Sequence, residues 1–373
     1  MQIDTILIKV ASRCNIDCTY CYIFNMGDEG WRSMPSLMSE ETIDDLVRSF
    51  SQLIKDQDVP FATVLHGGEP LMLGARRLQH LLIKLREVLP LNYPISLQTN
   101  GILITGEILD LCSKYKVSIS VSVDGPREIN DKFRVDKQGE GTYQKVVEGI
   151  NLLRHHQDSD FLYAGLLCVI DPDSNPEEVY KSLKGLGAKS IDFLCRDGNH
   201  TNLPYGKSTV NSTEYGEWLV KLLEIYISDT TPVKIRFLDD ILRISLGGIG
   251  TKEGLGDNFY GIVIIEADGS LSKNDTLKSN FNGADKFDEK WVIKTARLSE
   301  VFKTPTFAEY YKLQNPTSKD CNSCDYLAIC GGGMPLHRWS KDNGYDNPSV
   351  YCSDQKVLIK KAISILKKEG MLQ

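Results

Sequence analysis

Residues 6–21 read ILIKVASRCNIDCTYC, an apolar run followed by three closely spaced cysteines. The apolar part predicts a β-strand over about residues 3–10. The thiols of Cys14, Cys18 and Cys21 are close enough to bind one face of an iron–sulfur cube and to leave one iron without a protein ligand. An iron with an open position is a place where chemistry can occur. The alternatives are a disulfide with a spare thiol, or a zinc site completed from elsewhere.

Short β-rich runs alternate with helical patterns up to about residue 200. The alternation implies a parallel α/β sheet with right-handed crossovers, either doubly wound or closed into a partial (β/α)6 barrel. Unusual residues follow four successive strands at the same end, which favours the barrel-type sheet. These residues are the cysteines at 14–21, Gly67-Gly68-Glu69, Thr99-Asn100-Gly101 and Ser122-Val123-Asp124. The six predicted strands are 3–10, 61–66, 95–98, 117–123, 162–170 and 190–194, and the helices between them are 39–55, 76–88, 106–114, 143–155 and 176–185.

The alternation stops beyond about residue 200. The later patterns predict helices at 215–227, 238–246, 307–313 and 354–368, and a hairpin of residues 261–265 and 270–272. We therefore divide the chain into a core at 1–210, a bridging region at 211–300 and a cysteine-rich C-terminal region at 301–373.

Composition limits the class of protein. The 373 residues are 41% hydrophobic and carry 43 basic and 50 acidic side chains, a formal charge of −7 that argues against general nucleic-acid binding. The first residues lack a secretion signal and no apolar stretch approaches the length of a membrane span, so we expect a cytoplasmic protein without a membrane partner. Ten cysteines in such a protein indicate metal ligands and free thiols rather than disulfides.

A second cysteine group follows the pattern Cys321-x2-Cys324-x5-Cys330, with Cys352 further on. Four such thiolates can close a zinc site or bind the corners of a [4Fe-4S] cluster. Spacing alone does not choose between them.

The first motif resembles the signature of the radical S-adenosylmethionine (SAM) enzymes, C-x3-C-x2-C with an aromatic, here Tyr20, before the last cysteine. The resemblance implies that the open iron of a [4Fe-4S] cluster chelates SAM, which is cleaved to a 5′-deoxyadenosyl radical. It also implies that Gly67, Gly68 and Glu69 receive the ammonium group of SAM. Thr99, Asn100, Ser122, Asp124 and Arg134 lie where relatives contact the rest of that molecule.

The second cysteine group resembles the SPASM extension of radical SAM peptide maturases, so the resemblance favours iron–sulfur over zinc. The full pattern has a further cysteine where this chain has Met334, and relatives with two auxiliary clusters have another where it has Asn274. We therefore expect one auxiliary [4Fe-4S] cluster, bound by Cys321, Cys324, Cys330 and Cys352.

Within that group the chain looks most like maturases that form three-residue cyclophanes in ribosomally made peptides. The resemblance implies a precursor peptide with a leader and an electron donor such as flavodoxin or ferredoxin as partners. Asp275 is the candidate catalytic base, and its alternative interpretation is an exposed turn aspartate. Competing functions are thioether formation, sulfatase-type formylglycine maturation and, in a different class, a non-catalytic zinc scaffold.

Overall fold

The structure is a computed structural model that describes residues 2–372. The chain forms two compact units. The first consists of Met1–Val123, Asn130–Gly165 and Tyr260–Tyr311, and the second of Asp124–Ile129, Leu166–Phe259 and Lys312–Gln373. The predicted limits at 1–210, 211–300 and 301–373 follow the order of motifs and stay a prediction, and their outer ends, Met1 and Gln373, lie outside the described residues.

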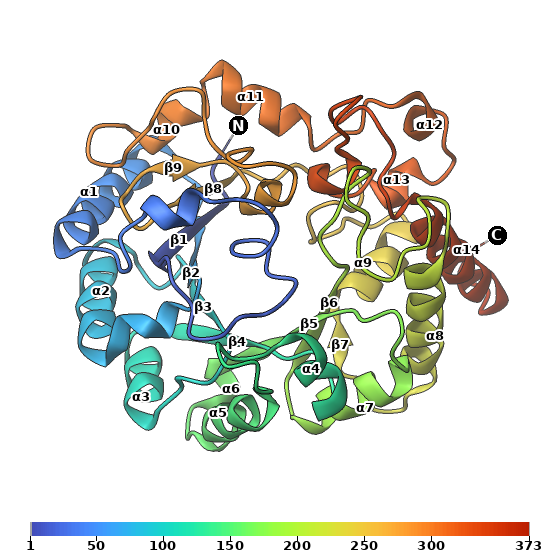
Figure 1. The fold of residues 1–373 in the computed structure, drawn as a ribbon, viewed down its shortest axis with the longest axis horizontal. Coiled ribbons are helices and arrows are strands. Elements are labelled where there is room, and N and C mark those ends of the chain that lie inside the picture. Colours follow the sequence, from blue (N-terminus) through green and yellow to red (C-terminus); the bar gives the residue numbers. More distant parts are fainter. Residues whose placement is uncertain (1, 373) are drawn as a thin grey trace. The chain divides into compact units, whose positions relative to one another are not determined.

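The first unit is built on a mostly parallel sheet in the order β4-β3-β2-β1-β8-β9. Helices α1, α2 and α3 lie on the same side of its strands (Figure 1). The strands are β1 (Thr5–Ala11), β2 (Ala62–Gly67), β3 (Ile95–Thr99), β4 (Val117–Ser122), β8 (Ile262–Ile265) and β9 (Leu271–Ser272). The longer helices are α1 (Glu40–Asp56), α2 (Gly74–Val88), α3 (Gly106–Lys114), α5 (Tyr143–His155) and α11 (Pro305–Lys312), and the short ones are η1 (Gly30–Ser33), η2 (Pro70–Leu73), α6 (Ser159–Leu162), η3 (Asp275–Ser279) and α10 (Leu298–Val301).

Local sequence explains why these elements begin where they do. Ser39 caps α1 by accepting a hydrogen bond from the Thr42 backbone N–H at 3.1 Å, as its position before two acids predicts. In β1, Ile6, Ile8 and Val10 are fully buried, which fits a strand with neighbours on both edges.

The second unit contains the end of the β/α repeat and the later helices. Strands β5 (Tyr163–Val169), β6 (Ser190–Leu194) and β7 (Lys234–Ile235) pair in parallel, and the first residues of β5 belong to the first unit. The helices are α7 (Pro176–Gly185), α8 (Glu214–Ser228), α9 (Arg236–Ser245), α12 (Lys319–Asn322), α13 (Leu327–Cys330), η4 (Pro335–Arg338) and α14 (Cys352–Lys368), and α4 (Arg127–Phe133) has residues in both units.

A buried ion pair holds the beginning of α14 in the second unit. Lys207 donates to Asp354 at 2.6 Å, and the other oxygen of Asp354 accepts from the Gly216 backbone N–H at 2.7 Å. A Cβ at Gly216 would lie 2.7 Å from the Asp354 backbone, so only glycine permits this approach of α8 to α14. The contact positions Cys352, two residues earlier on α14.

All six predicted strands of the β/α repeat are present, with ends shifted by one or two residues. The structure differs from the prediction at the hairpin, because β8 also pairs in parallel with β1, from Thr5 with Ile262 to Ile8 with Ile265. This pairing is long-range and has no local signal. None of the helices within residues 2–372 is long and apolar enough to cross a membrane.

Candidate active site and metal centres

The first cysteine group lies on the loop that follows β1. A β-bulge offsets β1 against β2, since Lys9 pairs with His66 but Ala11 pairs with Gly67. Beyond it, the loop is held by backbone hydrogen bonds from Thr19 to Phe133 and from Cys21 to Cys18, both at 3.0 Å. The three cysteines are partly buried free thiols.

Burial suppresses ionisation of these thiols. It raises the pKa of Cys14 to about 11 and that of Cys21 to about 12. Thiolates at these positions therefore require compensating positive charge, which bound iron supplies. The donor chemistry fits a metal cluster.

Gly67 and Gly68 bring the second strand against this loop. Gly68 donates its backbone N–H to Ala11 at 2.9 Å, and Glu69 donates to Arg13 at 3.0 Å. Gly67 has a φ of +136°, and a Cβ there would lie 2.1 Å from the Ala11 carbonyl oxygen. A Cβ at Gly68 would lie 2.4 Å from the Arg13 carbonyl oxygen. In this structure the two glycines allow a close approach to the chain just before Cys14.

Glu69 is a fully buried hydrogen-bond acceptor at the centre of the site. It accepts from the Thr99 hydroxyl at 2.7 Å, the Asn100 backbone N–H at 2.8 Å and the Leu71 backbone N–H at 3.0 Å. Burial raises the pKa of this carboxyl, and the hydrogen bonds oppose that shift. The Asn100 side chain donates to Asn15 at 2.7 Å, which links Glu69 to the cysteine loop.

We expect Glu69→Gln to lower the melting temperature and to weaken SAM binding. The amide would present an NH2 group where one oxygen now accepts, so a buried backbone N–H would lose its partner, at a cost of about 1–3 kcal/mol. Calorimetry and equilibrium dialysis measure the two effects. Glu87→Gln, on the exposed part of α2, is the matched control. If Glu69→Gln had the same melting temperature and SAM affinity as Glu87→Gln, the role that we assign to the hydrogen bonds of Glu69 would be contradicted.

Tyr20 and Arg134 meet at the same loop. The buried Arg134 guanidinium donates to the Tyr20 hydroxyl at 2.9 Å. Its charge acts on both Glu69 and Cys14 and favours their ionised forms. The structure thus brings the predicted residues Tyr20, Glu69, Asn100 and Arg134 together with the cysteine loop.

Ser122 and Asp124, at the end of the fourth strand, have separate surroundings. The Ser122 hydroxyl accepts from the Gln98 side chain at 2.9 Å within the first unit. Asp124 belongs to the second unit, where its buried carboxylate accepts from the Val169 backbone N–H at 3.0 Å. Their predicted contacts with SAM stay predictions.

Asp275 lies in a buried network of five charged side chains that sequence reasoning missed. We call Lys9, Glu266, Asp275, Lys278 and Asp285 the buried ion network. Lys9 donates to Asp275 at 2.5 Å, and Lys278 lies 2.9 Å from Glu266, 2.9 Å from Asp275 and 3.2 Å from Asp285. Asp275 is 3% exposed, so its alternative interpretation as an exposed turn residue is wrong. The sequence contained one signal of this network, Lys9, which is a lysine between apolar residues of a predicted strand.

The two lysines control the charge of Asp275. Burial alone would raise the pKa of Asp275, but Lys278 and Lys9 outweigh it and hold that pKa well below its usual range. Burial raises the pKa of Asp285, whose Oδ1 has no hydrogen-bond partner. The Tyr22 hydroxyl donates to Asp275 at 3.0 Å, and burial lowers the pKa of the nearby His66 to about 4.

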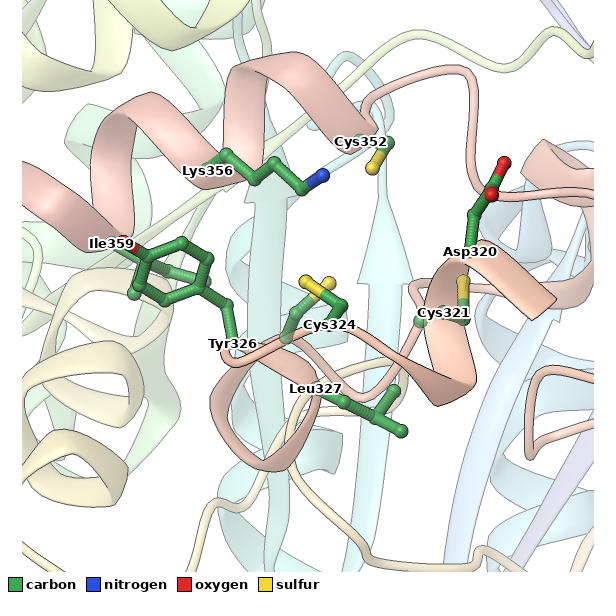
Figure 2. A pocket seen from close by; sticks show the side chains of 10 residues that line it. Asp320, Cys321, Cys324, Tyr326, Leu327, Cys352, Lys356 and Ile359 are labelled. Atoms are coloured by element: carbon green, nitrogen blue, oxygen red, sulfur yellow. The ribbon is translucent and has the colours of Figure 1, made fainter. Parts of the chain in front are cut away.

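The second cysteine group lines one hollow in the second unit. Cys321 is on α12, Cys330 ends α13 and Cys352 begins α14. Figure 2 shows Cys321, Cys324 and Cys352 around this hollow together with Lys356. Burial raises the pKa of Cys330 to about 12, and its Sγ lies 2.5 Å from the Gln355 side-chain oxygen. Four soft donors around one hollow fit a metal cluster.

Met334 and Asn274 occupy the two positions where the SPASM pattern named above would have further cysteines, and both have other contacts. Asn274 caps η3 by accepting from the Thr276 backbone N–H at 3.1 Å. Met334 packs against Gly254, where a Cβ would lie 2.9 Å from the Met334 Cγ. Neither residue offers a thiolate.

The structure has a parallel α/β sheet, a three-cysteine loop after the first strand and the buried Glu69 after the second, which is the arrangement that the sequence predicts for an enzyme that binds SAM at an iron–sulfur cluster. Residues 8–186 match the sequence model of the Radical SAM superfamily. The match supports an enzyme that uses SAM radical chemistry, and SAM and a [4Fe-4S] cluster are the cofactors of the matched superfamily, as predicted. The alternative of a non-catalytic zinc scaffold therefore has no support.

Curated relatives match the chain over most of its length. It is 26% identical over 364 residues to a cysteine-type anaerobic sulfatase-maturating enzyme of Clostridium perfringens, covering 94% of each chain. It is 24% identical over 361 residues to a serine-type anaerobic sulfatase-maturating enzyme of Bacteroides thetaiotaomicron, covering 90% of this chain and 83% of the relative.

Among solved structures, native anSMEcpe with bound AdoMet matches with a TM-score of 0.82 and 24% identity, covering 98% of both chains. This match extends through the C-terminal cysteine region. The predicted fold class, an α/β radical SAM core followed by a SPASM-type region, is confirmed.

Proposed function

We propose that this protein modifies a side chain of a peptide or protein substrate by radical SAM chemistry. The observation that carries the proposal is the hydrogen-bonded connection from Glu69 through Asn100 and Asn15 to the cysteine loop. It joins the candidate ligands of the catalytic cluster to the candidate acceptor of the SAM ammonium. Two curated relatives that span most of the chain are sulfatase-maturating enzymes, which supports a polypeptide substrate.

In this proposal, Cys14, Cys18 and Cys21 hold the catalytic cluster. When bound, the cluster and SAM supply a 5′-deoxyadenosyl radical that removes a hydrogen atom from the substrate. Gly67, Gly68 and Glu69 receive the ammonium of SAM, Arg134 supplies positive charge near Glu69, and the remaining contacts come from Tyr20, Thr99, Asn100, Ser122 and Asp124.

The C-terminal hollow is proposed to hold one auxiliary [4Fe-4S] cluster on Cys321, Cys324, Cys330 and Cys352. Met334 and Asn274 remove two thiolates from the second auxiliary site of relatives, so we propose that this chain lacks it. If bound there, the cluster would supply an acceptor for the electron that the substrate releases. A flavodoxin or ferredoxin is the proposed electron donor of the enzyme.

The finer proposal is a carbon–carbon crosslink between an aromatic ring and a β-carbon two residues away, a cyclophane. Its support comes from two neighbouring residues. Residue 274 is asparagine where relatives with two auxiliary clusters have a cysteine, and the next residue, Asp275, is the acid that could act as the base. Forming this bond removes one hydrogen atom from the β-carbon, and one proton and one electron from the ring. Asp275 is the proposed proton acceptor, and the partner is a ribosomally made precursor peptide with a leader.

A second candidate function is oxidation of a cysteine or serine to formylglycine. Two curated relatives are sulfatase-maturating enzymes, and this favours formylglycine formation. For a cysteine substrate the two functions differ in the atoms of the product, because a cyclophane loses only two hydrogens whereas a cysteine converted to formylglycine also exchanges its sulfur for oxygen. A serine converted to formylglycine also loses only two hydrogens, and the fragmentation that a crosslink blocks distinguishes it from a cyclophane.

High-resolution mass spectrometry of substrate peptides tests the proposal. We would co-express the protein with a short precursor peptide encoded beside its gene, and separately incubate reconstituted protein with a peptide carrying a sulfatase-type cysteine. We expect the precursor to become two hydrogens lighter, with fragmentation blocked between the crosslinked residues. The variant with alanine at Cys14, Cys18 and Cys21 is the control. Sulfur loss from the second peptide would favour formylglycine formation, and no change in either would contradict polypeptide modification.

A further inference from the structure

Gln355 is in direct contact with one of the four cysteines of the second group. It lies on α14, three residues after Cys352, which begins that helix. The Cys330 thiol donates its hydrogen to the Gln355 side-chain oxygen, with Sγ and Oε1 2.5 Å apart. Within residues 2–372, no other side chain forms a hydrogen bond with a sulfur of this group.

The position of Gln355 on its helix keeps the amide at the hollow. Residues three and four apart share one face of a helix, so Gln355 and Lys356 lie on the same face as Cys352. The other end of the amide faces the turn after Cys330, because a Cβ at Gly333 would lie 3.6 Å from the Gln355 Nε2. Gly333 has no side chain to hinder a rotation of that amide.

The contact changes character when the thiol binds iron. A primary amide has an oxygen that accepts hydrogen bonds and an NH2 group that donates them. Iron binds the thiolate, so the Cys330 proton leaves and the sulfur can then only accept. The Gln355 oxygen would face a negatively charged sulfur with no hydrogen between them. Half a turn about the last side-chain bond replaces this oxygen with Nε2 and restores a hydrogen bond, now from nitrogen to sulfur.

We propose that Gln355 donates a hydrogen bond to the Cys330 sulfur of the bound auxiliary cluster and thereby raises the reduction potential of that cluster. This inference rests on the proposed function, since it requires a cluster on Cys321, Cys324, Cys330 and Cys352. Gln355 acts through Cys330, so it is a positioning residue and not a catalytic one.

The sign of the effect follows from electrostatics. Hydrogen bonds to the ligand sulfurs are among the factors that set the potential of an iron–sulfur cluster. Reduction adds one electron and makes the sulfurs more negative, so a donor stabilises the reduced form more than the oxidised form. The couple involves only the oxidised cluster, one electron and the reduced cluster. A higher potential makes the cluster a better acceptor for an electron released by the substrate.

Two charged residues line the same hollow, and their effects have to be separated from that of Gln355. Lys356 is half-buried and Asp320 is exposed, and Figure 2 shows both around the hollow. By charge alone, Lys356 would raise the potential and Asp320 would lower it. Substitutions of Gln355 leave both residues in place, so a shift in those variants reports on the residue at position 355.

The experiment uses full-length protein with alanine at Cys14, Cys18 and Cys21, so that only the auxiliary site binds iron. The reduced cluster is followed by EPR in a redox titration. Gln355→Leu keeps the size of the side chain but removes the donor. We expect it to lower the equilibrium constant for reduction about threefold, or ~28 mV for one electron. Gln355→Glu should lower it further, because a carboxylate adds negative charge beside the sulfur. Ser364→Glu adds the same charge to an exposed part of α14 and should leave the potential unchanged.

The outcomes separate the donor role from a role of shape. A potential in Gln355→Leu that equals or exceeds that of the background would overturn the proposal. If Gln355→Leu binds no iron, Gln355→Lys decides, because lysine provides N–H donors of its own. Recovery of about four irons per chain would then support a donor at this position, and a soluble but iron-free Gln355→Lys would overturn it. If the background with Gln355 intact binds no iron, the proposed auxiliary cluster fails and the inference with it, a result distinct from an unchanged potential.

Discussion

Replacing Cys14, Cys18 and Cys21 with alanine is expected to abolish 5′-deoxyadenosine production while leaving about four irons per chain, against about eight in the unsubstituted protein. The three thiols lie on one loop, connected through Asn15 and Asn100 to Glu69. Without them the proposed catalytic cluster has no protein ligands. The second cysteine group lies in the other compact unit and should keep its cluster.

Chromatography of the nucleoside products and colorimetric iron and sulfide assays on anaerobically reconstituted protein provide the measurements. Cys112→Ala is the control, because Cys112 is a fully buried thiol of α3 outside both cysteine groups. Normal SAM cleavage by the triple variant would contradict the assignment of these ligands. A reproducible value near twelve irons in the unsubstituted protein would instead mean that a second auxiliary site survives without thiolates at Met334 and Asn274.

Asp275→Asn is expected to retain 5′-deoxyadenosine formation in the presence of substrate and to lower crosslinked product by about 10² to 10⁴-fold. A base that removes a late proton is needed for the product but not for SAM cleavage. Single-turnover assays that quantify both nucleoside and modified peptide separate these steps. Loss of both activities would instead assign Asp275 to positioning the peptide.

The buried ion network requires a matched control for this variant. Lys9 and Lys278 both contact Asp275, and removing one partner of a buried ion pair typically costs about 3–5 kcal/mol. Asp285→Asn makes the same change in the same network, because Asp285 also contacts Lys278, at 3.2 Å. We expect Asp285→Asn to retain product. Equal losses in the two variants would mean that the network supports the fold and that Asp275 is not the base.

The lowered pKa of Asp275 also defines a pH dependence of stability. A carboxyl whose pKa is lower in the folded than in the unfolded protein stabilises the fold above its unfolded pKa of about 3.9. That contribution disappears as the pH falls through the folded pKa. The same lowering of its pKa makes Asp275 a weaker proton acceptor. The comparison with Asp285→Asn therefore tests whether Asp275 acts as the base despite its low basicity.

Much of the fold follows from local patterns. Strand and helix ends came within one or two residues of the prediction in the β/α repeat, because apolar periodicity and caps such as Ser39 act over only a few residues. The cysteine groups were visible for the same reason. The ligands at 14, 18 and 21 lie on one loop, so their spacing in the chain reports directly on their spacing in space.

Short elements escaped prediction because they lack a full period of hydrophobic pattern. Strand β7 has two residues, and α12 and α13 have four residues each. The pairing of β8 with β1 joins residues more than 250 positions apart, from Thr5 with Ile262 onward. No local property of either segment specifies that register.

The sequence by itself determined the alternation of strands and helices, the two cysteine groups and the order of the SAM-site motifs. Only the tertiary structure decided which charges are buried and what faces them. Asp275 reads locally as a turn residue, yet packing places it between Lys9 and Lys278. Arg338 has no local signal for burial, yet packing buries it completely. Burial and pairing of charge depend on segments distant in the chain, and these properties control proton affinity.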